Sequence, residues 1–85
     1  MSTSPEAAQR IEDRLIAVIS RWLGRHIGNE ELRQSIAEAG TDGLAPSQAD
    51  AVRELAEALE RAEEGQRQHL EMVARETVEV LALGV

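Results

Sequence analysis

The chain of 85 residues has no cysteine, lysine, phenylalanine or tyrosine, and a single tryptophan is its only aromatic side chain. The lack of cysteine excludes disulfides, thiolate metal sites and cysteine nucleophiles. With one tryptophan, binding of single-stranded nucleic acid by base stacking is not supported. We expect an aliphatic core of leucine, isoleucine, valine and alanine. In a chain this short, such a core is marginal without further stabilisation, for example from an oligomer.

Long apolar runs are missing as well, and none approaches the roughly 18 residues of a membrane span. The N-terminal sequence MSTSPEAAQR is polar throughout, so we expect no signal peptide and a cytoplasmic location. The formal net charge of −7 disfavours binding to nucleic acids and to anionic membranes. These features predict partners that are neither nucleic acid nor membrane.

Apolar residues recur at steps of three and four along most of the chain, which predicts an all-α protein. We expect a disordered tail at residues 1–4 and a single helical domain over residues 5–85. The first helix is predicted to begin at Pro5 and to end near Leu23, where Gly24 caps it. A short second helix is predicted over residues 30–39, with Asn29 as its N-terminal cap and Gly40 at its end.

The remaining segment, residues 46–83, keeps one apolar stripe in phase but contains Gly65 in a polar stretch over residues 63–69. Two interpretations are open. Either the helix breaks at Gly65 and folds back to give four helices, or it runs through, with the glycine costing about 1 kcal/mol relative to alanine. The continuous helix is favoured because the stripe keeps its phase and no Pro, Asn, Asp or Ser accompanies the glycine.

A continuous helix over residues 46–83 would be roughly 55 Å long at about 1.5 Å per residue. A compact chain of this length has a radius of gyration of only about 12 Å, so one end would project and expose apolar residues. This geometry predicts a homodimer, or binding of another protein, with apolar stripes in contact and Glu and Arg at the rim. The residues predicted at the interface are Trp22, Leu59, Leu70, Val73, Val80 and Leu81.

Motifs for catalysis or ligand binding are not found. His26 and His69, the only histidines, lack a second metal ligand three or four residues away on a helix face. The sequence contains no nucleophile elbow and no glycine-rich phosphate loop. We therefore predict no metal, no cofactor and no enzymatic activity, and a function as a helical interaction or regulatory module.

An alternative function comes from the sequence Gly43-Leu44-Ala45-Pro46-Ser47, which opens a helix in a small acidic chain. This stretch resembles the acyl carrier proteins, in which a serine at the start of a long helix carries phosphopantetheine. The resemblance implies that Ser47 is the modified residue. The sequence departs from the family's Asp-Ser-Leu at both neighbours, with Pro46 in place of the aspartate and Gln48 in place of the leucine. From the residues alone, Ser47 is a helix-capping serine.

Overall fold

The backbone of Gly65 has a φ of 90°, and the chain reverses direction there. The computed structural model describes residues 10–62 and 65–83. Helix α4 (Pro46–Arg61) ends before the glycine and α5 (Arg67–Leu83) begins after it. The favoured prediction of one continuous helix is therefore wrong, and the alternative with four helices is confirmed. The physical reason is burial, because folding back lets the apolar stripe of α5 pack against the rest of the same chain.

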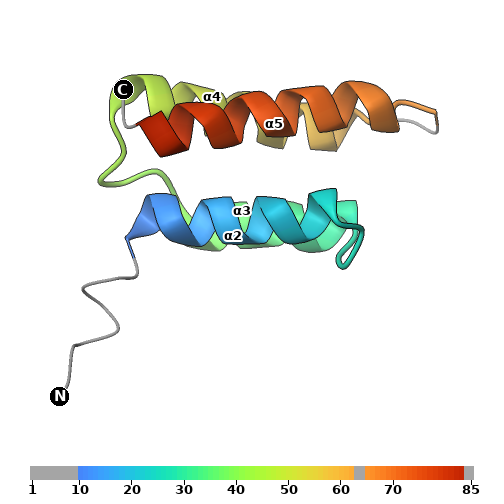
Figure 1. Cartoon of the computed structure of the whole chain (residues 1–85), viewed down its shortest axis with the longest axis horizontal. Coiled ribbons are helices and arrows are strands. Elements are labelled where there is room, and N and C mark those ends of the chain that lie inside the picture. Colours follow the sequence, from blue (N-terminus) through green and yellow to red (C-terminus); the bar gives the residue numbers. More distant parts are fainter. Residues whose placement is uncertain (1–9, 63–64, 84–85) are drawn as a thin grey trace, which may run out of the picture.

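Two shorter helices precede the hairpin, α2 (Ile11–Leu23) and α3 (Asn29–Ala39). Successive helices run antiparallel, and α5 packs against both α4 and α2, which closes a four-helix bundle (Figure 1). The part of the chain that the structure describes contains no strand. Arg10 is extended, with a ψ of 155°, so α2 begins later than predicted. The predicted tail at residues 1–4 lies outside the described residues.

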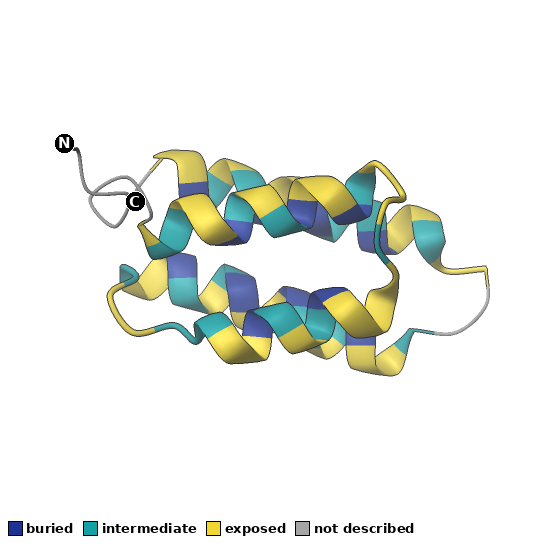
Figure 2. Ribbon diagram, turned by 90° about the horizontal axis from the view of Figure 1, so that it is seen from below, coloured by how far each residue is buried: buried dark blue, intermediate teal, exposed yellow. Residues whose placement is uncertain are grey.

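The core consists of side chains spaced by three or four residues on each helix, so that each buried stripe faces the other helices (Figure 2). Removing one leucine, isoleucine or valine side chain from water contributes roughly 1.5–3 kcal/mol. The buried apolar residues are Leu15, Ile19, Trp22, Leu32, Ile36, Val52, Leu55, Leu59, Leu70, Ala74 and Leu81. Every helix contributes at least two of them, so the core depends on all four helices together.

One buried polar side chain, Gln48, joins the start of α4 to the end of α5. Its Oε1 accepts a hydrogen bond from the Ala45 backbone N–H at 2.9 Å, and its Nε2 donates to the Leu81 carbonyl at 3.2 Å. Gln48 is only 2% exposed. Both hydrogen bonds satisfy backbone groups at helix ends, which have no partner within their own helix.

Within the described residues, no helix is both long enough and apolar enough to cross a membrane.

Candidate interaction surface

Closure of the bundle buries most of the residues predicted at an interface. Trp22, Leu59, Leu70 and Leu81 lie in the core, and Val73 and Val80 are half-buried. The hairpin at Gly65 explains this placement, because the strongest apolar positions of α5 now contact α2 and α4 of the same chain. That these six residues form an interface between chains stays a prediction.

A different set of side chains faces outward on α5. It surrounds Met72, which is 53% exposed and is one of two large apolar side chains left exposed in the described residues. These side chains line a hollow of about 440 Å³, and we call them the Met72 surface: Gln68, Glu71, Met72, Arg75, Glu76 and Glu79. Spacings of three and four residues place them on one side of α5. An apolar centre with a charged rim is the usual make-up of a protein–protein contact.

Apart from the Met72 surface, a second group of interacting side chains lies around Trp22, where α2 ends and α5 begins. The indole Nε1 donates a hydrogen bond to Asn29 Oδ1 at 2.7 Å. The Arg67 guanidinium lies 4.0 Å from the centroid of the Trp22 ring, and its Nη2 donates to the Trp22 carbonyl at 2.9 Å. The prediction that Asn29 caps the second helix is wrong, because Gly28, which has no side chain, takes the capping position and Asn29 is the first residue of α3.

Glu71 lies at the centre of this second group and is approached by three arginines. Arg67 Nε donates to Glu71 Oε2 at 2.8 Å, while Nη2 of Arg75 lies 3.8 Å from Oε1 and Nη2 of Arg25 lies 4.0 Å from Oε2. The hydrogen bond from Arg67 holds the pKa of Glu71 below its ordinary value, and the three positive charges act in the same direction.

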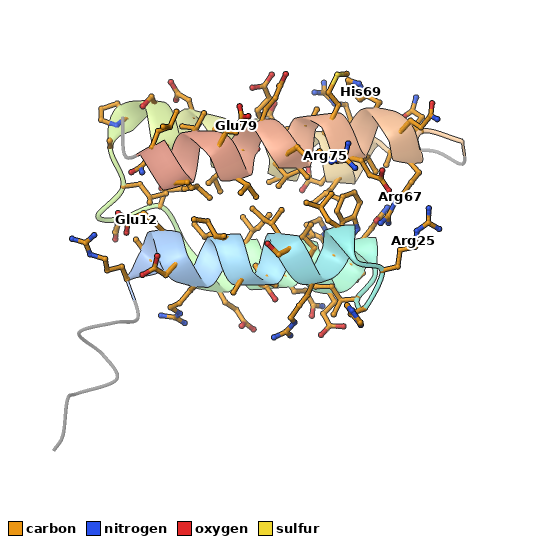
Figure 3. All side chains as sticks on the ribbon, viewed as in Figure 1. Glu12, Arg25, Arg67, His69, Arg75 and Glu79 are labelled. Atoms are coloured by element: carbon orange, nitrogen blue, oxygen red, sulfur yellow. The ribbon has the colours of Figure 1, made fainter. Side chains whose placement is uncertain are left out.

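We call Arg25, Arg67 and Arg75 the arginine cluster. Arg25 and Arg67 lie at one end of the bundle, Arg75 lies about two turns further along α5, and Glu12 marks the other end (Figure 3). Arg25 has a φ of 65° and follows the last residues of α2. Its N–H donates to the Trp22 carbonyl at 2.9 Å, and the next N–H, of His26, donates to the Arg21 carbonyl at 2.9 Å. These two bonds form a Schellman motif, with an arginine where glycine is usual.

The remaining candidate residues lie apart. His26 is exposed in the connection between α2 and α3, and His69 is exposed on α5 (Figure 3). Among the described residues, no three His, Cys, Asp or Glu side chains are grouped as metal ligands. Ser47 is exposed as the second residue of α4, and the prediction that it caps the helix is wrong, because Ala45 takes the capping position. Its neighbour Gln48 is buried. The glutamine thus has a structural role at the position where carrier proteins have leucine.

Comparison with known proteins gives no relative. No protein-family model matches the chain, and no curated protein and no solved structure matches it significantly. A four-helix bundle supports many unrelated functions, so the fold alone does not specify one. A functional assignment for this chain therefore has to rest on its own surface.

Proposed function

We propose that the chain is a non-enzymatic helical interaction module that binds a second copy of itself or another protein through the Met72 surface. The observation that carries this proposal is the 53% exposure of Met72 at the centre of a hollow rimmed by charge. Methionine is flexible and polarisable, and it adapts to the shape of a partner.

The charge of the Met72 surface predicts opposite salt dependence for binding of a second copy and for binding of a basic partner protein. Glu71 is already paired with Arg67, and the remaining charges are Glu76 and Glu79 against Arg75, so two copies would still bring like charges together. Added salt screens that repulsion and should strengthen self-association. A basic partner would instead be attracted, and its binding should weaken as salt is added.

Site-specific photo-crosslinking tests the proposal directly. A photoreactive amino acid replaces Met72 in one variant and Ala37 in a control, since Ala37 is exposed on α3, across the bundle from α5. We expect a discrete crosslinked product from position 72 and none from position 37, both with the purified chain and in the organism that makes it. A product of twice the chain's mass identifies a homodimer, and any other discrete mass identifies a partner protein. No discrete product from position 72 in either setting would overturn the proposal.

A second candidate function follows from the exposure of Ser47 at the start of α4, where a modifying enzyme could reach its hydroxyl. In this alternative, the chain is a small acidic carrier-like protein with phosphopantetheine on Ser47. Intact mass is measured after incubation with coenzyme A and a phosphopantetheinyl transferase, with Ser47→Ala as the control. A mass increase that the control lacks supports the carrier function, and an unchanged mass excludes it.

A further inference from the structure

The arginine cluster is an exception to the charge balance of the rest of the chain. The net charge is −7, yet three of the nine arginines approach one carboxylate, that of Glu71. Elsewhere in the described residues, each paired carboxylate has a single arginine, as Asp50 has Arg53 and Glu57 has Arg61. The cluster together with Glu71 carries a local charge of about +2 on an acidic protein.

The three arginines differ in how many of their N–H donors already make hydrogen bonds within the protein. Arg67 is held by Glu71, by the Trp22 carbonyl and by the Trp22 ring, and its side chain is largely covered. The side chains of Arg25 and Arg75 are 75% and 71% exposed. Both lie too far from Glu71 for a hydrogen bond, at 4.0 and 3.8 Å. Their N–H donors are therefore not satisfied by the carboxylate between them.

The backbone fixes the points from which these two side chains extend. Arg25 belongs to the Schellman motif that ends α2, and Arg75 lies in the middle of α5. The two helices are joined at this end by the hydrogen bond from Arg67 to the Trp22 carbonyl. A guanidinium has five donors in a planar arrangement that matches the oxygens of a phosphate group. A phosphate dianion also matches the local charge of the cluster.

We propose that Arg25 and Arg75 bind the phosphate group of a small ligand at the end of the bundle where α2 ends and α5 begins. The Glu71 carboxylate, held by Arg67, attracts both guanidiniums to the same place, and it limits the affinity because its negative charge opposes that of the ligand. The site is open to water and screened by salt, so binding in the millimolar range is expected for inorganic phosphate alone. Arg75 also belongs to the Met72 surface, so bound phosphate would add negative charge to that surface.

The test is a titration of the ¹⁵N-labelled full chain with inorganic phosphate, followed by NMR at constant ionic strength. We expect saturable shifts of the Nε–H signals of Arg25 and Arg75. The Trp22 indole N–H should shift as well, since its ring stacks on Arg67. Sodium chloride at the same ionic strength should give only small, linear shifts. A parallel titration with phenyl phosphate shows whether a phosphate ester binds as tightly as free phosphate. Similar affinity means that the phosphate group alone is recognised, and tighter binding indicates that the ligand is a phosphate ester.

Substitutions make the test decisive. Arg25→Ala and Arg75→Ala should each weaken phosphate binding about fivefold or more, and the double variant should lose saturation. Arg53→Ala is the control, because the Arg53 side chain is also exposed, at 59%, and pairs with a single carboxylate on α4. Glu71→Gln keeps an oxygen acceptor for Arg67 and removes the opposing charge, so it should tighten binding about threefold or more. A purely structural ion-pair cluster would not gain affinity from that change.

Linear shifts like those of chloride, or equal binding by wild type and the Arg25→Ala, Arg75→Ala double variant, would overturn the proposal. The titration involves no partner protein and the crosslinking at position 72 involves no phosphate. The phosphate site and the Met72 surface can therefore each fail without the other.

Discussion

Replacing Gly65 with alanine should shift the chain from the hairpin toward the continuous helix. At a φ of 90°, an L-residue is strained, and the left-handed region costs roughly 1–2 kcal/mol per residue. In a continuous helix the same change is favourable by about 1 kcal/mol, since alanine is the better helix former. The balance between the two forms should thus move by about 2–3 kcal/mol. No atom lies within 4 Å of the position of an added Cβ, so the cost comes from the backbone alone.

Burial opposes this shift within a single chain. Straightening the helix would expose Leu70 and Leu81, which are buried in the bundle, and the core side chains that they cover. Two leucines alone account for roughly 3–6 kcal/mol, at roughly 1.5–3 kcal/mol each. The monomer should therefore keep the hairpin with reduced stability. At high concentration, two extended chains can recover the burial by exchanging α5, which is a domain swap.

Thermal and urea unfolding, followed by circular dichroism, measure the loss of stability. A loss of about 1–2 kcal/mol corresponds to a fall in Tm of roughly 5–15 °C for a chain of this size. Gly65→Asn is the matched control, because asparagine adopts the left-handed region more readily than alanine and is a weaker helix former. Sedimentation should show more dimer for Gly65→Ala than for the control. Equal Tm and equal mass for the two variants would refute the role given to Gly65.

Two further predictions concern polar groups in the fold. Gln48→Ala removes both hydrogen bonds of a buried side chain and leaves the Leu81 carbonyl without that donor. Urea unfolding should therefore show that the free energy of unfolding falls by about 1–3 kcal/mol. A fall no larger than that of the exposed control Gln34→Ala would contradict this prediction. The pKa of Glu71 is lowered on folding, so its contribution to stability is present at neutral pH and lost as pH falls through that lowered pKa. Glu71→Gln should reduce the acid-induced fall in Tm, and an unchanged profile would argue against the arginine contacts.

The helices themselves could be predicted because their determinants are local. The spacing of apolar residues and the turn residues place the end of α2 at Leu23, the start of α4 at Pro46 and the end of α5 at Leu83, as the structure shows. The break at Gly65 could not be decided in this way. An apolar stripe that stays in phase is compatible with both a rod and a hairpin, and the choice depends on burial against α2, which lies far away in the sequence.

The polar groups at the end of the bundle could not be predicted for a related reason. Arg67 and the Trp22 carbonyl are 45 residues apart, and no local pattern links them. Asn29 shows the limit of local reasoning, since its side chain accepts a hydrogen bond from the Trp22 indole and does not cap α3. The exposure of Met72 is only weakly indicated by the sequence, where it is an apolar residue between Glu71 and Arg75 that lies outside the main apolar stripe.

The hairpin also determines where a protein partner can bind. In a rod, the strongest apolar positions of residues 46–83 would face a partner, whereas in the closed bundle they face the core. A binding surface on the closed bundle must then use positions outside the stripe, where an exposed apolar residue has no role in the core. Met72 meets that condition at 53% exposure. If Gly65→Ala dimerises by exchanging α5, Met72→Glu should leave that dimer intact, because the exchanged contacts are those of the core. An association through the Met72 surface should instead be lost in Met72→Glu and kept in Gly65→Ala, so the two kinds of dimer can be told apart by these two substitutions.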